Sequence, residues 1–287
     1  RRIIKKENPD YLIIHLITSL PIILNFIFNF DTKFILRISG YPKLNFTRKL
    51  LWKLLGKNLH KIVCPTEATR KFLIDKKIFD EKKIFVLKDP IIEISKINFL
   101  KRAKVNNIEF NKNRYLLSIG RLSKQKNFLF LIKCFNLIVK QYPNFKLIII
   151  GEGELENEIK NYINKLNLND KIKLLPFQEN IFNYLNQTEC LILSSLWEDP
   201  GFVLIEAASV GTSIISSNCP NGPVEFLENG KGGFLFESND INHFLSIFKK
   251  YLESTELDKN IMRLNAKKKS NSYSTFRHYL DLIKILN

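Results

Sequence analysis

The sequence is poor in the side chains that most often bind metals or form disulfides. Of 287 residues, only four are cysteine and four are histidine. None of the cysteines stand at the short spacings of zinc-binding or redox motifs, and the histidines are equally scattered. This scatter argues against a disulfide framework and a histidine-built metal site, and it suits a reducing compartment. The eight positions are Cys64, Cys134, Cys190, Cys219, His15, His60, His243 and His278.

Acidic residues are also scarce. The chain has 45 Lys and Arg against 28 Asp and Glu, a formal net charge of +17. Such an excess attracts polyanions, which include nucleic acids, an anionic membrane surface and phosphorylated ligands. A hydrophobic content of 45% with 25% charged residues is ordinary for a globular chain, which excludes disorder as the main state. The length allows one large domain or two of ordinary size.

One long run without charges raises the question of a membrane span. Residues 11–30 contain no acid or base, a length sufficient for a spanning helix, and four basic residues precede them. Polar residues interrupt the run, however, and Pro21 lies at its middle. We favour a buried strand over Tyr11–Leu16 followed by a helix over Leu20–Phe30, with Pro21 in the first helical turn. No small-residue cleavage site closes the run, which disfavours a signal peptide.

Glycine is sparse in the first part of the chain. Of 11 glycines, only Gly40 and Gly56 precede Gly120. A glycine after a strand marks a place where the backbone turns tightly or approaches a ligand closely. The sequence therefore predicts that phosphate-type ligand chemistry is concentrated in the second half.

Short apolar runs alternate with amphipathic stretches along the rest of the chain. This alternation predicts parallel sheets with helices on both faces, the α/β class. The expected strands are Lys33–Ile38, Lys61–Cys64, Ile84–Leu87, Tyr115–Ile119, Lys146–Ile150, Ile172–Leu175, Cys190–Leu193 and Ser213–Ser216. The expected helices include Phe46–Leu55, Thr66–Lys76, Phe128–Gln141 and Glu154–Leu166. The polar segment Ile91–Asn113 lacks a clean period and is predicted to link two α/β units.

A strand that ends in Gly120 is followed by two cations. Arg121 and Lys126 lie five residues apart, just before a helix that begins near Asn127. Two fixed cations beside a helix N-terminus can hold a diphosphate without a divalent metal. Considered alone, the motif is explained equally well as a solvated basic turn.

A second glycine motif, Gly151-Glu152-Gly153, directly follows the expected strand Lys146–Ile150. The third glycine of a dinucleotide-binding fingerprint is missing, because Glu154 follows. We therefore interpret this motif as a tight turn between a strand and a helix.

A third constellation runs from Glu198 to Glu206. These two carboxylates bracket a Pro-Gly turn that opens the apolar helix Phe202–Val210. The free N–H groups of the first turn of that helix would face an anion, and Glu206 can accept hydrogen bonds from sugar hydroxyls. Glu198 can contact a second set of hydroxyls or simply charge the start of the helix. A glutamate inside an apolar helix needs a partner, which makes Glu206 the stronger functional candidate.

In this order and spacing, the three segments resemble the donor-binding domain of the family 4 retaining glycosyltransferases, also called glycosyl transferases group 1. Similar elements follow them at residues 207–211, 222–225 and 229–235. The resemblance runs from about residue 114 to the C-terminus and extends more weakly over about residues 9–89. Within the family, the chain is most similar to enzymes that build lipopolysaccharide core and other surface glycans. The resemblance implies two facing Rossmann-like domains of the GT-B type, with the nucleotide sugar held by the C-terminal one.

The resemblance also implies a role for each matching residue. Arg121 and Lys126 would neutralise the donor diphosphate in the place of a metal, and no cofactor is expected. Glu206 would bind the ribose, and Glu198 would hold the transferred sugar. Phe177 falls in the base-contacting loop, although a core aromatic explains it as well. The implied donor-binding residues are Gly120, Arg121, Lys126, Phe177, Glu198, Gly201, Phe202, Val203 and Glu206, and the implied catalytic residues are Arg121, Lys126, Glu198 and His15.

Three departures from the family pattern affect these expectations. The chain begins at what corresponds to the family's fourth strand, so we expect an N-terminally truncated, incomplete first domain. A catalytic histidine often follows the fifth strand, where this chain has Arg37. His15 follows the preceding strand and is a weaker candidate, because a lone histidine in an apolar run is more often a core residue. Asn127 stands where the family often has glycine, and asparagine can also adopt a left-handed turn.

These observations predict a retaining glycosyltransferase that moves a sugar from a UDP- or GDP-sugar to a glycan or lipid-linked acceptor in surface polysaccharide synthesis. We expect a partial acceptor-side domain over residues 1–95, a donor-binding domain over 96–270, and a helix over 271–287 that crosses back to the first domain. The protein is expected in the cytoplasm, in peripheral contact with an anionic membrane face. One alternative is an inactive or scaffold fragment that retains only donor binding. A nucleic-acid-binding protein is disfavoured, because the lysines are dispersed and no recognised motif accompanies them.

Overall fold

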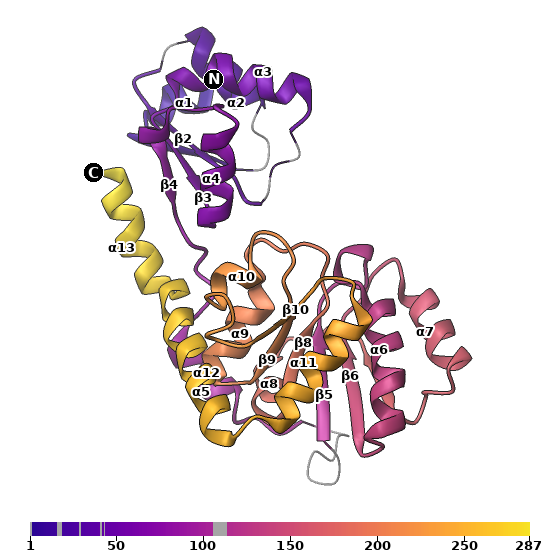
Figure 1. Cartoon of the computed structure of the whole chain (residues 1–287). Coiled ribbons are helices and arrows are strands. Elements are labelled where there is room, and N and C mark those ends of the chain that lie inside the picture. The colour runs from indigo at the N-terminus through magenta and orange to yellow at the C-terminus, as the bar shows by residue number, and fades with distance from the viewer. Residues whose placement is uncertain (1, 16–18, 29, 41, 43, 106–113) are drawn as a thin grey trace. The chain divides into compact units, whose positions relative to one another are not determined.

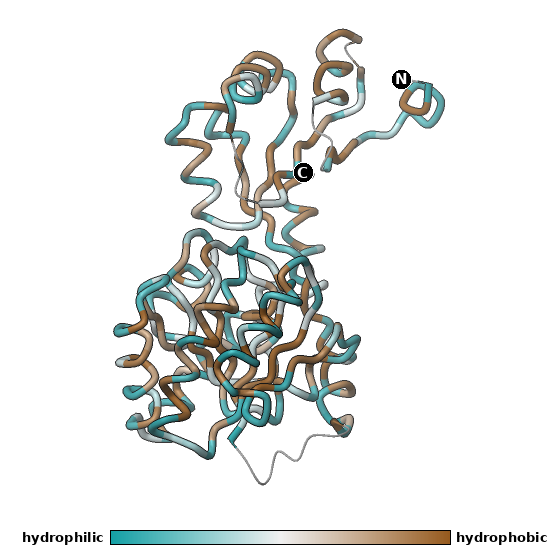
Figure 2. Tube along the Cα trace, turned by 90° about the vertical axis from the view of Figure 1, so that its right-hand side faces the viewer, coloured by the Kyte–Doolittle hydropathy of each residue, from teal (hydrophilic) through white to brown (hydrophobic). Residues whose placement is uncertain are grey.

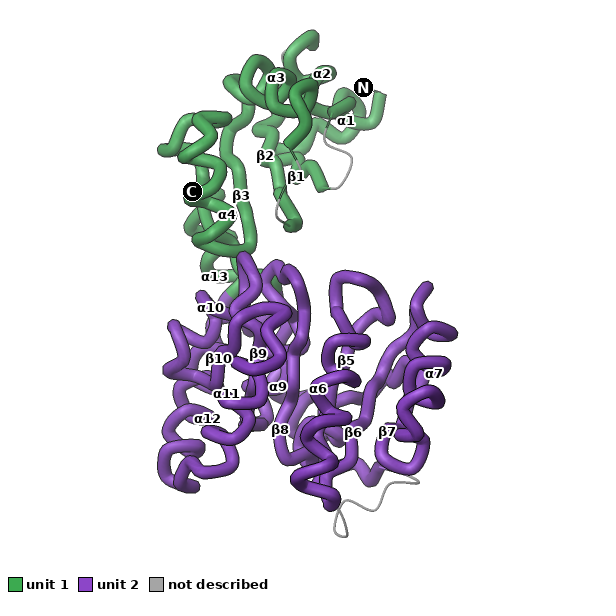
Figure 3. Tube along the Cα trace, turned by 45° about the vertical axis from the view of Figure 1, so that its right-hand side comes forward, with its two compact units in different colours: residues 1–89, 278–287 green, residues 90–277 purple. Residues whose placement is uncertain are grey.

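The computed structural model describes all residues except 1, 16–18, 29, 41, 43 and 106–113 (Figure 1). The chain divides into two compact units, shown in separate colours in Figure 3. Unit 1 comprises residues 1–89 and 278–287, and unit 2 comprises residues 90–277. Each boundary lies a few residues from the expected 95/96 and 270/271.

Unit 1 is built on a four-stranded parallel sheet in the order β1-β2-β3-β4. The strands are β1 (Tyr11–His15), β2 (Lys33–Arg37), β3 (Lys61–Cys64) and β4 (Ile84–Val86). Its helices are α1 (Arg2–Glu7), α2 (Ser19–Phe28), α3 (Phe46–Leu55) and α4 (Glu67–Asp75), with short 3-10 turns at Gly56–Asn58 and Glu81–Lys83. The helices pack on the sheet through a core of hydrophobic side chains that includes Ile22, Leu36 and Trp52.

The uncharged run at residues 11–30 forms a strand and a helix, as favoured from the sequence. β1 ends at His15, and α2 begins at Ser19 with Pro21 in its first turn, where a missing N–H costs no hydrogen bond. Ile22 and Asn25 are the buried residues of α2, and the Asn25 amide donates to the carbonyl oxygen of Asn58 at 3.2 Å. No helix in the part of the chain that the structure describes is long and apolar enough to span a membrane.

The C-terminal helix α13 (Thr275–Leu286) ends within unit 1. The Tyr11 hydroxyl donates to the carbonyl oxygen of Leu286 at 2.8 Å. Ile285 is buried in a small cluster with Ile35 and Val63 on the other face of the four-stranded sheet. Residues 278–287 therefore belong to unit 1 and pack on this second face of its sheet.

Unit 2 contains a six-stranded parallel sheet in the order β10-β9-β8-β5-β6-β7. The strands are β5 (Arg114–Ile119), β6 (Phe145–Ile150), β7 (Ile172–Leu175), β8 (Cys190–Leu193), β9 (Ile214–Ser217) and β10 (Phe234–Phe236). The helices are α5 (Ile94–Leu100), α6 (Phe128–Gln141), α7 (Glu156–Lys165), α8 (Phe182–Gln187), α9 (Phe202–Val210), α10 (Pro223–Phe226), α11 (Ile241–Glu253) and α12 (Glu256–Ser270), with 3-10 turns at Lys124–Lys126 and Asn271–Tyr273. Two parallel-sheet units confirm the predicted α/β class.

Helices cover both faces of the six-stranded sheet. One core cluster joins the strands to α6, α7 and α11 and contains Phe135 and Phe244. The other joins them to α8 and α9 and contains Ile205 and Tyr273. Because both faces are buried, these strands are almost continuously apolar, whereas brown and teal alternate along the helices in Figure 2. This burial fixes the strand ends from which the loops of the candidate site emerge.

The expected linker is in part a helix. Within Ile91–Asn113, residues 94–100 form α5, and residues 106–113 lie outside the described part of the chain. Ile97 is buried in the core of unit 2, and the Asn180 amide donates to the carbonyl oxygen of Leu100 at 2.9 Å. The predicted linker thus contains a short helix, which tertiary packing stabilises although its sequence has no clear amphipathic period.

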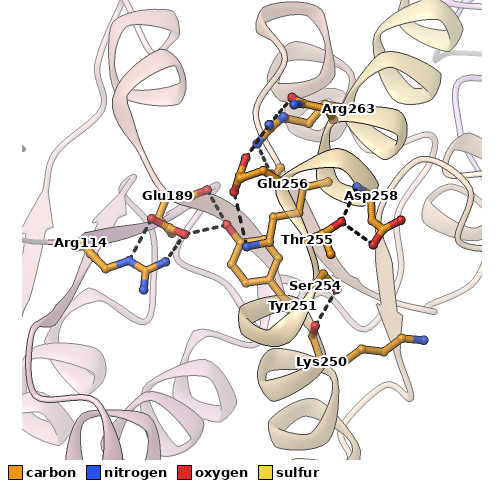
Figure 4. Close-up of polar contacts among 12 residues, drawn as sticks. Arg114, Glu189, Lys250, Tyr251, Ser254, Thr255, Glu256, Asp258 and Arg263 are labelled. Atoms are coloured by element: carbon orange, nitrogen blue, oxygen red, sulfur yellow. Dashed lines mark hydrogen bonds and ion pairs between the residues drawn. The ribbon is translucent and has the colours of Figure 1, made fainter.

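A polar network joins the amino ends of β5 and β8 to α11 (Figure 4). Glu189 accepts a hydrogen bond from Nε of Arg114 at 3.1 Å and another from the Tyr251 hydroxyl at 3.0 Å. Burial acts to raise the pKa of the Glu189 carboxyl, but the contact with Arg114 opposes it and the net pKa is lowered. The ammonium of Lys259 lies 4.5 Å from the centre of the Tyr251 ring. The network holds the helices at the end of the sheet opposite the candidate site.

Candidate functional site

The candidate site lies at the carboxyl ends of the strands of unit 2. From β5 the chain winds outward to β7, and from β8 it winds in the other direction to β10, so β5 and β8 flank the point where the winding reverses. In open parallel sheets, ligands bind outside the carboxyl ends at this point, because the loops from the two strands leave in opposite directions. The three motifs singled out in the sequence follow β5, β6 and β8. The fold therefore brings all three to one edge of the sheet.

The loops after β5 and β6 touch through glycine. A Cβ atom on Gly151 would lie 1.9 Å from the carbonyl oxygen of Gly120, and one on Gly153 would lie 2.5 Å from that of Leu122. The Leu122 N–H donates to the carbonyl oxygen of Glu152 at 2.8 Å. Only glycine permits this approach, so Gly151 and Gly153 form the tight turn predicted from the sequence.

The two cations of the first loop have different surroundings. Lys126 forms an ion pair with Glu198, and the hydroxyl of Ser195 donates to the same carboxylate oxygen at 2.6 Å. Glu198 is only 4% exposed, so the pair is largely removed from water. Arg121 is exposed, and its side chain has no ion pair or hydrogen bond among the residues that the structure describes. Arg121 is thus free to meet an anion, whereas Lys126 is already engaged.

The loop after β8 leads from Glu198 into the first turn of α9. Gly201 is the N-terminal cap of this helix, with a φ of 94° that glycine adopts without steric cost. The backbone N–H groups of Phe202 and Val203 come next, and the first N–H groups of a helix have no partner within it. Together with the helix dipole, they favour a negatively charged group at this position.

Glu206 lies one turn further along α9 and is partly buried. Burial raises the pKa of its carboxyl to about 7, and the nearby charge of Lys126 opposes that rise. Within the described residues, no hydrogen bond reaches the Glu206 carboxylate. The side chain can therefore accept hydrogen bonds from a bound ligand.

A cavity of about 510 Å³ opens among these loops. Six of the residues predicted to bind a donor line it, namely Gly120, Arg121, Phe177, Phe202, Val203 and Glu206. Lys126 packs its side chain against Gly120, which places the Lys126–Glu198 pair beside the cavity. No group of three or more His, Cys, Asp and Glu is placed to hold a metal ion in the described part of the chain.

Phe177 and its neighbours belong to the loop after β7, and this loop forms one wall of the cavity. Phe177 is 68% exposed, so its interpretation as a core aromatic is wrong. Its N–H donates to Oε1 of Glu152 at 3.1 Å, which ties this loop to the loop after β6. Glu152, Gln178 and Glu179 also line the cavity and were not predicted. The signal available in the sequence was their position directly after two expected parallel strands.

His15 belongs to unit 1, whereas the residues that line the cavity belong to unit 2. It ends β1, is exposed, and lies with Nε2 2.8 Å from the hydroxyl of Ser39. Arg37, which stands where the family often has histidine, forms an ion pair with Asp89 and donates to the carbonyl oxygen of Leu87 at 3.2 Å. A catalytic role for His15 stays a prediction.

Comparisons with known proteins agree on one family. The sequence profile of Glycosyl transferases group 1 matches residues 101–269. An uncharacterized glycosyltransferase of Methanocaldococcus jannaschii is 35% identical over 244 residues, which are 79% of this chain and 60% of that protein. The UDP-Gal:alpha-D-GlcNAc-diphosphoundecaprenol alpha-1,3-galactosyltransferase of Escherichia coli is 35% identical over 154 residues, 53% of this chain and 39% of that protein. This chain therefore spans less than two thirds of the length of either relative.

A solved structure shows the same fold. The crystal structure of Anabaena HepE in complex with UDP superimposes with a TM-score of 0.83 at 17% sequence identity, covering 99% of this chain and 80% of that one. This likeness confirms the predicted architecture of two Rossmann-like domains of the GT-B type.

Proposed function

The chain belongs to the glycosyl transferases group 1 family, and on that premise we propose that it transfers a sugar from a nucleotide diphosphate donor to a lipid-linked or glycan acceptor in surface polysaccharide synthesis. The observation that carries this proposal is the cavity of about 510 Å³ at the reversal point of the unit 2 sheet. A free arginine, a helix N-terminus and an unpartnered carboxyl line the same space. A diphosphate attached to a ribose needs this set of groups.

The donor's phosphates would lie between Arg121 and the first turn of α9. When the bond to the sugar breaks, negative charge develops on the departing diphosphate, and stabilising that charge is the main task of the protein. Arg121 and the N–H groups of Phe202 and Val203 supply fixed positive charge without a metal. Lys126 is close enough to contribute once a phosphate competes with Glu198 for its ammonium group.

The two glutamates would hold the donor's hydroxyl groups. Glu206 would accept from the ribose, and Glu198 would face the transferred sugar, where its charge is balanced by Lys126. We propose retention of anomeric configuration by same-face attack, with the leaving phosphate as the base. This step moves the acceptor hydroxyl proton to the departing phosphate oxygen, as the new sugar–oxygen bond forms.

The acceptor and location are proposed from two observations. The Escherichia coli relative is named for an acceptor built on diphosphoundecaprenol, a lipid carrier. All four cysteines are free and buried, as expected of a reducing compartment. We therefore propose that the protein works in the cytoplasm against an anionic membrane face that presents a lipid-linked acceptor.

Arg121→Ala tests the donor site most directly. Loss of one charge-assisted contact is expected to weaken UDP binding about tenfold or more in isothermal titration. Lys124→Ala is the matched control, because Lys124 is exposed, lies in the same loop and does not line the cavity. Its effect should stay below about threefold, the range of a screened surface charge. Equal affinities for the two variants would refute the proposed phosphate position, and GDP titrated in the same way identifies the preferred base.

A second candidate function is donor binding without transfer. The observation that favours it is that all the residues lining the cavity belong to unit 2. Transfer of labelled sugar to a diphosphate-linked polyprenyl acceptor separates the two functions. Product formation that Arg121→Ala reduces supports the transferase, whereas tight UDP binding without product from any acceptor tested supports the alternative.

A further inference from the structure

Helix α3 of unit 1 exposes an apolar face. Phe46, Leu50 and Leu54 are 79%, 47% and 55% exposed. They are spaced four residues apart, so they share one face of the helix. The opposite face carries Trp52, which is buried in the core of unit 1. Three large apolar side chains in one stripe are more than the single exposed residues common on soluble surfaces.

Lysines are interleaved with this apolar face. Lys49, Lys53 and Lys57 follow the same three- and four-residue spacing and are exposed. Between Asp31 and Glu67 the sequence has eight Lys or Arg and no acidic residue. The exposed side of α3 therefore combines apolar and positive groups without negative ones nearby in the sequence.

A cavity of about 360 Å³ lies at the C-terminal end of α3. Its lining includes Lys53, Lys57, Lys77 and Lys83, with Asp80 as the acidic member. The ammonium of Lys83 donates hydrogen bonds to the carbonyl oxygens of Lys57 and Leu59, both at 2.8 Å. No ion pair within the described residues engages Lys53, Lys57 or Lys77. Four lysines against one aspartate around this cavity favour an anionic group of the size of a phosphate.

We propose that this face of α3 docks on the surface of an anionic phospholipid bilayer. Phe46, Leu50 and Leu54 enter the boundary between headgroups and acyl chains, while the lysines of α3 and the adjoining cavity contact lipid phosphates. Charge complementarity selects this partner, because an apolar stripe edged by cations matches the layered chemistry of such a surface. The inference deepens the lipid-linked acceptor proposed above, but it is tested without donor or acceptor.

Another helix provides an internal comparison. On α12, Leu257, Ile261 and Leu264 are 69%, 49% and 66% exposed, so their apolar stripe is as large. That helix begins with Glu256 and Asp258, whose charges an anionic surface repels. Of its five basic residues, three form ion pairs: Lys259 and Arg263 with Glu256, and Lys269 with Glu228. Charge, and not apolar exposure alone, therefore favours α3.

Vesicle co-sedimentation of the full chain measures the docking. Vesicles of phosphatidylcholine with phosphatidylglycerol are compared with vesicles of phosphatidylcholine alone. Leu50→Ser with Leu54→Ser removes apolar area, and we expect the partition coefficient on the anionic vesicles to fall about tenfold or more. Lys53→Glu with Lys57→Glu should lower it by a similar factor on anionic vesicles at low salt and change little at high salt.

Leu257→Ser with Leu264→Ser is the matched control, because it also removes two exposed leucine side chains, in this case from α12. It should leave partitioning unchanged within about twofold. Unaltered UDP affinity of the α3 variants, whose changes lie in unit 1, would show that the chain is still folded in unit 2, and circular dichroism would show retained helix content. Equal binding by all variants, or a loss confined to the α12 variant, overturns the proposal.

The mass of the protein in solution tests whether a second copy of the chain, and not a bilayer, covers the exposed face of α3. Light scattering of the wild type is expected to give a monomer that the α3 substitutions leave unchanged. A dimer that Leu50→Ser with Leu54→Ser dissociates would mean that a second copy covers this face, and it would overturn the bilayer assignment. Failure of UDP binding, in contrast, refutes the proposed function and leaves the vesicle result standing.

Discussion

Glu206 carries a free-energy cost that a single substitution should remove. Burial raises the pKa of its carboxyl from the ordinary 4.5 to about 7 in the folded chain, with Lys126 opposing the rise. Below pH 4.5 the carboxyl is protonated in both the folded and unfolded states, so it costs nothing. As the pH rises above 4.5, the unfolded chain ionises first, and the folded state is destabilised until the pH passes about 7. At higher pH the cost is constant.

The size of that cost follows from the difference in pKa. A shift from 4.5 to about 7 corresponds to about 3 kcal/mol at roughly 1.4 kcal/mol per pKa unit. This is an upper limit, because Glu206 keeps some contact with water. Glutamine has a similar shape and no charge, so Glu206→Gln should stabilise unit 2 by up to about 3 kcal/mol at pH 8 and by nearly nothing at pH 4.5.

Urea unfolding followed by tryptophan fluorescence measures this difference. The chain has two tryptophans, Trp52 in unit 1 and Trp197 in unit 2, so a Trp52→Phe background reports on unit 2 alone. The free energy of unfolding is compared with and without Glu206→Gln from pH 4.5 to 8.5. The exposed Glu158→Gln on α7 is the control, and it should not give the increase in stability at pH 8 that Glu206→Gln gives. The same Glu206→Gln chain should bind UDP more weakly, because an amide replaces the carboxylate offered to the ribose.

One result would refute this reasoning. If Glu206→Gln raises the free energy of unfolding equally at pH 4.5 and pH 8, the increase cannot arise from a shifted carboxyl pKa. A destabilisation at pH 8 would show that the folded chain favours the charged form, which requires a partner for Glu206 beyond those found among the described residues.

Substitutions at three further positions have expected outcomes in the same unfolding assay. Gly151→Ala should cost more than about 3 kcal/mol and weaken UDP binding, because its Cβ would lie 1.9 Å from the carbonyl oxygen of Gly120; a cost below 1 kcal/mol would contradict that contact. Tyr251→Phe should cost about 1 kcal/mol through the lost hydrogen bond to Glu189, with UDP affinity unchanged. Asn127→Ala should cost about 1 kcal/mol, since Asn127 has a φ of 55° and alanine tolerates this left-handed conformation poorly, whereas Asn127→Gly should be nearly neutral.

The order of elements could be predicted from the sequence because its signals are local. The apolar runs at 61–64 and 190–193 became β3 and β8 with the expected bounds, and α6 spans Phe128–Gln141 as expected. Each of these segments is long or apolar enough for its own pattern to decide the structure. The short β10 was not predicted, because three residues are too few to show a period.

Contacts between distant segments could not be predicted in the same way. The pairing of Lys126 with Glu198 joins residues 72 positions apart, and it depends on β5 and β8 being neighbours in the sheet. The contact of Gly151 with Gly120 depends likewise on β5 and β6. The sequence showed that these residues follow strands, but strand order decides which of them meet. The family resemblance implied Rossmann-like domains, and the structure supplies the strand order and the distances.

The two glutamates at either end of the β8–α9 loop show most clearly what spacing leaves undetermined. In the sequence both flank the same turn, and only the apolar helix around Glu206 makes it the stronger functional candidate. In the folded chain, Glu198 contacts the ammonium of Lys126 and the hydroxyl of Ser195. Among the described residues, only the charge of Lys126 opposes the effect of burial on Glu206. A ribose hydroxyl that donates to Glu206 would favour its charged form and lower its pKa. Above pH 7 the free chain already bears the free-energy cost of the buried, charged Glu206 carboxylate. A hydrogen bond from the ribose offsets part of that cost, so the side chain that destabilises the free chain favours donor binding.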